Sequence, residues 1–214
     1  MTDAPPRWRR RKTARPSEIA AAALEVFAEK GFAAARLEEI AARAGVSKGA
    51  LYLYFEAKEE LFRAAASQAV SPNLAAARAM AEAHAGPFAD LAPLLLMRIA
   101  AVASGGRIPS VIKMVIGESR NFPDLAKAWY ETVVSPALGL ISGLIAKAQA
   151  RGEVRPGDPR LHALSLAGPM IAGVIMREVF EPVGAPPLDL EALAVQHART
   201  VLHGMLVEAE GAAA

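Results

Sequence analysis

Hydrophobic positions along the chain recur with the period of an α-helix rather than that of a β-strand. In the first such segment, apolar residues spaced four, seven and eight positions apart share one helical face: Ile19, Ala23, Val26 and Phe27. Ser17 supplies a hydroxyl for an N-cap, and Gly31 can adopt the left-handed conformation that ends a helix. The pattern predicts a first helix from Ser17 to Lys30.

Two shorter periodic segments come after this helix. The apolar face of the first of them consists of Leu37, Ile40, Ala41 and Ala44, and the segment stops at Gly45. Ser47 can cap the second, which runs from Lys48 to about Tyr54 with Leu51 and Phe55 turned inward. Two short helices joined by a tight, glycine-containing turn predict a helix-turn-helix, a motif that places its second helix in the DNA major groove.

The outward face of that second helix has a composition suited to DNA. Lys48 can reach guanine or phosphate, the tyrosine hydroxyls can donate to phosphate oxygens, and Leu53 can contact a thymine methyl. Gly49 and Ala50 are small enough to let the helix N-terminus approach the duplex. The alternative is that this face packs on another domain, which helical spacing does not exclude.

The remainder of the chain reads as further helices punctuated by glycine and proline. The predicted spans are 58–83, 87–103, 107–120, 123–150, 159–181 and 188–209. Pro136 and Pro169 fall inside periodic segments and are expected to kink them. The predicted fold class is all-α, with an N-terminal three-helix DNA-binding domain and a C-terminal helical domain.

Composition narrows the class of protein. The 214 residues are 53% apolar and 21% charged, which supports a buried core and excludes wholesale disorder. The two longest charge-free runs, 132–146 and 161–176, are shorter than the roughly 20 residues of a membrane span, so no membrane partner is expected. No secretory signal is visible and there is no cysteine, so disulfides and thiolate sites are excluded and the cytoplasm is the expected compartment.

The net charge of +2 is unevenly distributed. Residues 1–63 carry 12 basic and 9 acidic side chains, whereas residues 64–214 carry 12 and 13. Most of the excess lies in residues 1–15, which are predicted to form a basic flexible arm. Such an arm is either a solvated tail or a contact to a polyanion such as DNA, and the charge alone does not decide between them.

The stretch from Gly31 to Phe62 reads GFAAARLEEIAARAGVSKGALYLYFEAKEELF. Its glycine–aromatic turn, its IAxxAGVS core and its LYxYF helix resemble the DNA-binding domain of the TetR family of bacterial transcriptional regulators. The resemblance covers residues 16–65, with the helix-turn-helix at 36–55. It implies a homodimer whose remaining residues, 66–214, bind a small-molecule effector and pair the subunits, and many such proteins are repressors that the effector releases from DNA.

Matching this chain to the family's motif implies a set of DNA contacts at Arg36, Ser47, Lys48, Gly49, Ala50, Tyr52, Leu53, Tyr54 and Lys58. One position departs from the pattern. The family usually has threonine where this chain has Ala35, so a hydroxyl that can cap the next helix and touch phosphate is missing. Arg36 is expected to replace the phosphate contact, although it can equally be a solvated arginine.

Two further sets of candidates lie beyond residue 66. Flexible and aromatic side chains of the middle helices are candidates for the effector pocket: Met97, Met114, Glu118, Phe122, Trp129, Tyr130, Met170 and Met176. Apolar and small residues of the last two helices are candidates for the dimer interface: Leu164, Ala167, Gly168, Ile171, Val174, Ile175, Leu193, Val201 and Met205. Both sets can instead be core residues of one subunit.

Enzymatic functions find no support in the sequence. It contains no GxSxG, P-loop, GxGxxG or HExxH motif, and its four histidines are dispersed. No catalytic residue, metal or cofactor is predicted. The expected function is that of a ligand-responsive repressor, which binds a palindromic operator as a homodimer and is released by a small apolar effector. The alternative from another class is a helical carrier for an apolar ligand, without specific DNA binding.

Overall fold

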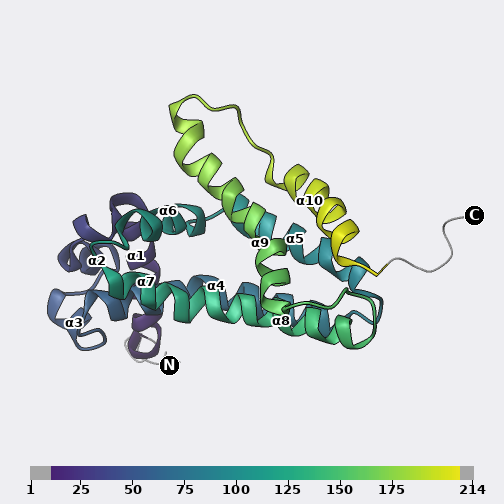
Figure 1. The fold of residues 1–214 in the computed structure, drawn as a ribbon. Helices are drawn as coiled ribbons and strands as arrows, with labels where there is room; N and C mark the ends of the chain where they lie inside the picture. Colours follow the sequence, from purple (N-terminus) through teal and green to yellow (C-terminus); the bar gives the residue numbers. More distant parts are fainter. Residues whose placement is uncertain (1–10, 208–214) are drawn as a thin grey trace, which may run out of the picture.

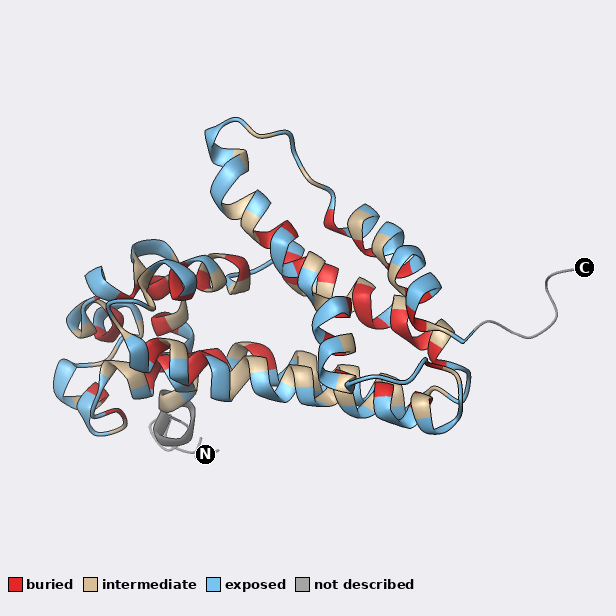
Figure 2. Cartoon of the chain, viewed as in Figure 1, coloured by how far each residue is buried: buried red, intermediate tan, exposed pale blue. Residues whose placement is uncertain are grey.

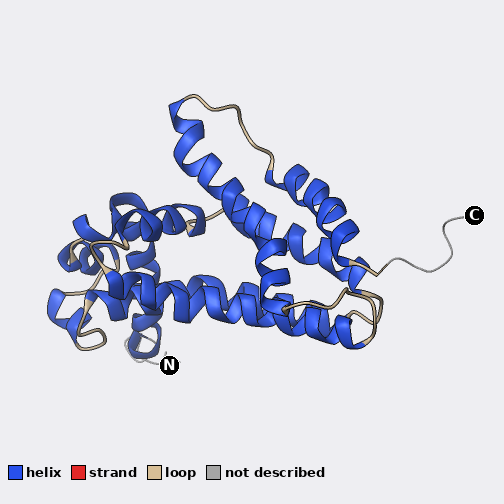
Figure 3. Cartoon of the chain, in the orientation of Figure 1, coloured by secondary structure: helices blue, strands red, loops and turns tan. Residues whose placement is uncertain are grey.

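The computed structural model describes residues 11–207, with side chains from Pro16 onward. Within this range every regular element is a helix, and the one extended contact is an isolated bridge between Val154 and Leu206 (Figure 3). The α-helices are α1 (Arg11–Ala34), α2 (Leu37–Arg43), α3 (Lys48–Tyr52), α4 (Lys58–Ala83), α5 (Phe88–Ser104), α6 (Ile108–Glu118), α7 (Pro123–Trp129), α8 (Ser135–Ala150), α9 (Pro159–Ile175) and α10 (Leu190–Met205). The predicted all-α fold is confirmed.

The first helix begins earlier than predicted. α1 starts at Arg11 and runs through Pro16, so Ser17 lies inside the helix rather than at its N-cap. A proline near the start of a helix is tolerated because its fixed φ is close to the helical value, although one backbone hydrogen bond is lost. Residues 1–10 of the predicted arm lie outside the described residues. The predicted break at Gly31 is confirmed, since its φ of 80° and ψ of 168° interrupt α1.

The predicted helix 123–150 is interrupted ahead of Pro136. A π-helical turn, η1 (Tyr130–Val134), joins α7 to α8. Pro136 has no N–H to donate to the carbonyl of Thr132, so the regular hydrogen-bond ladder fails at this point and the helix widens. In the predicted helix 159–181, by contrast, α9 continues through Pro169. Its departure from α-geometry comes later, in the π-turn η2 (Met176–Phe180) and the 3₁₀ turn η3 (Glu181–Val183).

Most of the buried side chains form two separate clusters. One, the head core, joins α1, α2, α3 and the first half of α4 to α6 and α7. The other, the body core, joins α5, α8, α9 and α10. Figure 1 shows the two groups at opposite ends of the molecule with α4 running between them, and Figure 2 shows buried residues concentrated in each. Ile112 of α6 packs against both clusters, so α6 connects the two ends.

The charge-free runs of the sequence are too short to cross a membrane, but the helices that contain them are longer. Two helical stretches, Pro123–Ala150 and Pro159–Val183, are long and apolar enough to cross a membrane by length and composition. They exceed the charge-free runs in the sequence because each helix continues past charged residues near its ends. Only a minor share of their apolar window is buried within the chain, so much of their surface remains available to a partner.

Candidate DNA-binding surface and effector pocket

The helix-turn-helix is built by local capping and a short turn. Gly45 ends α2 with a φ of 66°, and the Ser47 hydroxyl caps α3 by accepting from the Ala50 amide at 3.1 Å. Leu51 and Phe55 are buried in the head core, which fixes the rotation of α3. The helix itself ends at Tyr52, earlier than the predicted Tyr54, and Leu53 forms its C-cap.

This rotation leaves a mixed surface facing solvent. Leu53 has 82% of its surface exposed and Tyr52 has 44%, which are high values for large apolar or aromatic side chains. Gly49 has open space where a Cβ would stand, so nothing in the described part of the chain obstructs close approach to α3. Tyr54 differs from its neighbours because it is partly buried and packs against the head core.

Lys48 is not free in the unbound chain. Its ammonium forms an ion pair with the Glu38 carboxylate of α2 and lies 5.8 Å from the centre of the Tyr52 ring. The hydrogen bond to Glu38 raises the pKa of Lys48, and the same bond lowers the pKa of the Glu38 carboxyl. Sequence reasoning missed this partner because the two residues lie on different helices. DNA therefore competes with Glu38 for Lys48.

Two other predicted contacts lie beside α1 and α2. Arg36 is exposed at the N-cap of α2 and makes no side-chain cap, and the adjoining Ala35 is buried. Lys58 bends back toward α1, where its Nζ donates to the Ala33 carbonyl at 3.4 Å and lies 4.7 Å from the centre of the Phe32 ring. Burial lowers the pKa of Lys58. This lysine is thus partly withdrawn from the surface on which it was predicted to grip phosphate.

Glu118, the last residue of α6, connects this helix to the N-terminal helices α1 to α3, which we call the head. Its carboxylate accepts from the Phe32 amide at 2.9 Å and from the Ala33 amide at 2.7 Å. These donors are free because Gly31 interrupts α1, and a Cβ at Gly31 would collide with the Glu118 carboxylate. We call this contact of Glu118 with the amides of Phe32 and Ala33 the latch. Glu118 is a predicted residue of the effector pocket, but the structure places it in the latch.

An apolar cavity of about 490 Å³ lies between the head core and the body core. Its wall is formed by α4, α5, α6, η1, α8 and α9, together with Trp129 at the end of α7. Among its lining residues only Asn73 and Arg98 carry strongly polar side chains. A cavity of this size, lined by hydrocarbon with few polar groups, is typical of a small-molecule site.

Of the eight predicted pocket residues, the structure places Trp129 and Met170 on the cavity wall. The other six lie elsewhere. Met114 is buried in the head core, Phe122 packs edge-on against Phe32 with ring centres 5.2 Å apart, and Met97 packs on the body core. Besides Glu118, the remaining two are exposed: Tyr130 and Met176. Met97, Met114 and Phe122 thus pack in or against the two cores, whereas the cavity wall consists mostly of leucine, isoleucine and valine.

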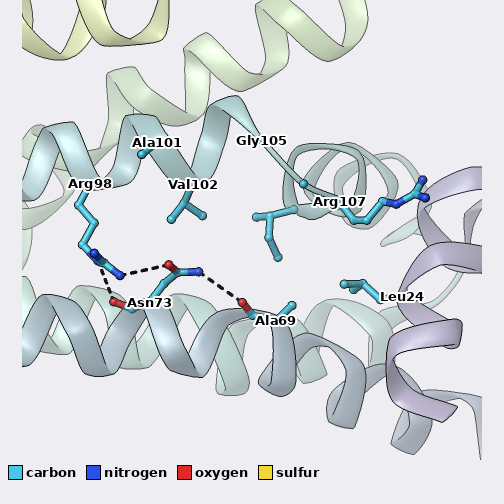
Figure 4. Close-up of a pocket in the computed structure, with 10 residues that line it drawn as sticks. Leu24, Ala69, Asn73, Arg98, Ala101, Val102, Gly105 and Arg107 are labelled. Atoms are coloured by element: carbon cyan, nitrogen blue, oxygen red, sulfur yellow. Dashed lines mark hydrogen bonds between the residues drawn. The ribbon is translucent and has the colours of Figure 1, made fainter. Parts of the chain in front are cut away.

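A second cavity of about 390 Å³ adjoins the first and shares Asn73, Arg98, Val102 and Ile108 with it. Figure 4 shows Arg98 reaching from α5 toward Asn73 on α4. The α5–α6 connection, with Gly105, Gly106 and Arg107, forms the other side of this cavity. The Arg98–Asn73 pair therefore stands where the two cavities meet.

The predicted dimer residues fall into three groups. Leu164, Ala167, Gly168, Ile171 and Val174 line the larger cavity, and Val174 is also fully buried. Met205 is buried in the body core, and Leu193 and Val201 pack against that core. Ile175 is partly buried. Apolar side chains that remain exposed on the last two helices include Leu161, Leu164, Ile171 and Val195.

The comparisons with known proteins agree with this geometry. Residues 19–65 match the family described as bacterial regulatory proteins, tetR family, and residues 89–190 match the tetracyclin repressor-like C-terminal domain. The HTH-type transcriptional regulator RutR of Escherichia coli (strain K12) is 30% identical over 162 residues, which cover 69% of this chain and 68% of RutR. The chain belongs to the TetR family. It is a helix-turn-helix transcriptional regulator.

Other TetR-family relatives support the same assignment. The HTH-type transcriptional repressor BepR of Brucella suis is 32% identical over 146 residues, covering 64% of this chain and 66% of BepR. A solved TetR-family regulator from Mesorhizobium loti superposes with a TM-score of 0.76 at 26% identity, covering 92% of this chain and 99% of that one. FadR of Bacillus subtilis, solved in complex with stearoyl-CoA, has the same fold, with a TM-score of 0.73 at 21% identity over 88% of this chain and 98% of that one.

The TetR family consists of transcriptional regulators that bind DNA and small-molecule effectors, typically as dimers. In the described part of this chain, no cluster of three or more histidine, aspartate or glutamate side chains is placed to hold a metal ion. The helix-turn-helix and the cavity are the features of this chain that correspond to DNA binding and effector binding in the family.

Proposed function

We propose that this TetR-family regulator is a ligand-responsive repressor that binds a palindromic operator as a homodimer and is released by a small, largely apolar effector. The observation that carries the proposal is the position of α6. Its residues Ile112 and Val115 line the apolar cavity, and its last residue, Glu118, holds the head at Phe32 and Ala33. An effector in the cavity thus contacts the helix that fixes the head's orientation.

In this proposal residues 16–65 read DNA. The exposed N-terminal part of α3, with Ser47, Lys48, Gly49 and Ala50, approaches base edges, and Tyr52 and Leu53 lie along the same surface. Arg36, Tyr54 and Lys58 contribute to phosphate binding at the flanks. In a dimer the two α3 helices enter successive major grooves about 34 Å apart.

Residues 66–214 bind the effector and pair the subunits. The apolar surface that α9 and α10 leave exposed in one chain is the surface that a second copy covers. Leu161 and Val195 are exposed on α9 and α10 and do not line the cavity, so they test pairing separately from effector binding. Leu161→Asp combined with Val195→Asp is expected to lower the mass measured by light scattering from dimer to monomer.

Release requires that the effector bind one arrangement of α6 better than another. A filled cavity displaces Ile112 and Val115, and Glu118 transmits the displacement to the α1–α2 junction. The spacing of the two α3 helices then no longer matches the operator half-sites. The rest of the chain needs no change in fold for this response.

Selecting fragments of the source genome with the purified protein tests the proposed function. We expect a small set of palindromic fragments, and we expect Leu53→Ala to change their sequence preference whereas Lys58→Ala, at a proposed phosphate contact, weakens binding to all of them. If no fragment is enriched at any salt concentration, the repressor proposal is wrong and the helical carrier is favoured. Recovery of the chain in the membrane pellet would likewise contradict a cytoplasmic regulator whose α9 and α10 pair with a second copy.

A further inference from the structure

We propose that the effector is an amphipathic organic anion, whose hydrocarbon part fills the apolar cavity and whose carboxylate or phosphate binds Arg98. The inference rests on the proposed function and narrows its effector from an apolar molecule to one with a negative charge at one end. It is carried by the placement, partners and charge of Arg98.

Arg98 is held in a defined orientation. Its Nε donates to the Asn73 carbonyl at 3.1 Å and its Nη2 donates to the Asn73 side-chain oxygen at 3.2 Å. Asn73 is itself oriented, because its Nδ2 donates to the Ala69 carbonyl at 3.4 Å (Figure 4). The guanidinium is thus fixed between α4 and α5 before any ligand arrives, which reduces the entropy lost on binding.

The positive charge of Arg98 has no counterion among the described residues. Neither cavity has an aspartate or glutamate in its wall, and no carboxylate in the described range forms an ion pair with Arg98. Arg107, which lines the smaller cavity, differs because it lies 3.6 Å from Glu29. A partly buried cation beside a hydrocarbon wall is costly unless an anion pairs with it.

The guanidinium also retains donors for an anion. The Asn73 bonds use Nε and one N–H of Nη2, so Nη1 has no acceptor in the part of the chain that the structure describes. A carboxylate or phosphate matches such a planar pair of donors, and charge-assisted bonds of this kind are among the strongest in proteins. A neutral ligand would leave Arg98 unpaired, and a cationic ligand would be repelled.

Calorimetric titration of the full-length protein tests the charge preference without any variant. Decanoate, decyl phosphate, decanol and decylammonium share one chain and differ in the end group. We expect both anions to bind about tenfold or more tightly than decanol, and decylammonium to bind most weakly. The stronger of the two anions identifies a carboxylate or a phosphate as the preferred head group. Equal affinity for decanoate, decyl phosphate and decanol, or no binding by any of them, overturns the proposal.

A matched pair of variants locates the effect. Arg98→Gln is expected to remove the preference for decanoate over decanol while leaving decanol affinity unchanged. Arg78→Gln, on an exposed arginine of α4 that lines neither cavity, is expected to change nothing. A preference for decanoate that persists in Arg98→Gln assigns the anion to another residue and overturns the role of Arg98. Enrichment of operator fragments is measured separately, so the repressor proposal can stand even if this one fails.

Discussion

The head core and the body core are built from different side chains. The head core contains a chain of aromatic contacts in which Phe27, Phe32 and Phe62 lie with ring centres 5.5 to 6.1 Å apart, and Trp129 lies 6.3 Å from Phe62. The body core consists mainly of alanine, leucine, isoleucine, valine and methionine, with Phe88 as its one buried aromatic among the described residues.

This difference matches the tasks of the two regions. Interlocked rings fill space closely and hold one geometry, which suits a surface that must present α3 to a rigid duplex. The aliphatic side chains of the body helices border a cavity of about 490 Å³, which lies between the body core and the head core. A binding region has to keep such a space, and the unfilled volume lowers its packing energy.

The largest expected effect comes from truncating one large side chain in each core. Phe32→Ala is expected to lower the free energy of unfolding by about 4 kcal/mol, because a ring packed on three others is lost. Met170→Ala should cost about 2 kcal/mol, because Met170 already borders empty space. Urea unfolding followed by circular dichroism measures both, and equal losses would show that the two cores are packed alike.

The latch between the regions is the next test. Glu118→Ala is expected to lower the free energy of unfolding by about 2 kcal/mol, because the amides of Phe32 and Ala33 lose their acceptor. Its sharper consequence is functional. The variant should still bind effector, as measured by calorimetry, but effector should no longer release operator DNA in an anisotropy assay. Glu82→Ala, at an exposed site on α4, is the control. If effector still releases operator DNA from Glu118→Ala, the latch does not transmit effector binding to the head.

Two helical glycines test how closely the body is packed. A Cβ at Gly173 would press on Leu190 and Leu193, so Gly173→Ala is expected to cost about 1 to 2 kcal/mol of unfolding free energy. Gly143 in α8 has open space around it, and Gly143→Ala should instead stabilise the chain by up to about 1 kcal/mol through helix propensity. Thermal unfolding of both variants should shift in opposite directions.

The smallest effect concerns the head surface. Glu38→Gln is expected to raise DNA affinity about twofold to fivefold at low salt, because Lys48 is released from its ion pair and a negative charge near the phosphates is removed. Since the pKa of Glu38 is lowered, this carboxylate is charged at neutral pH and the pair is intact there. The gain should shrink as salt is added. An unchanged affinity would show that Lys48 does not contact DNA.

Much of the fold could be predicted from local signals in the sequence. The predicted helix 58–83 coincides with α4, and the break at Gly31, the turn at Gly45 and the Ser47 cap all form as expected. These features depend on neighbouring residues alone, so the rules of helical periodicity and capping predict them. The predicted start of α1 was wrong because Ser17 is a good N-cap that the longer helix does not use.

The contacts that define the sites were harder to predict. Glu118 lies 85 and 86 residues from its partners, and Lys48 meets Glu38 from another helix, so no spacing rule connects them. Methionine and aromatic residues are the predicted lining of the pocket, whereas its wall consists mostly of leucine, isoleucine and valine, with Asn73 and Arg98 as its polar side chains. An arginine within the apolar segment 91–103 was the signal that could have found it.

The widened turn at Tyr130–Val134 bears on where this protein can gain or lose a residue in evolution. A π-turn accommodates one residue more than the α-helix around it, so it absorbs a single extra residue that would otherwise rotate the downstream helix α8 by about 100°. Ahead of it, Leu125 faces the head core, and beyond it, Ile145 faces the body core. Deleting Thr132 is therefore expected to restore a continuous α-helix and to leave Ile145 facing the body core, whereas deleting a residue from a regular turn of α8 would rotate every later residue by about 100°. The turn is therefore the place in this long helix where the chain can lose one residue without turning its buried side chains out of the core.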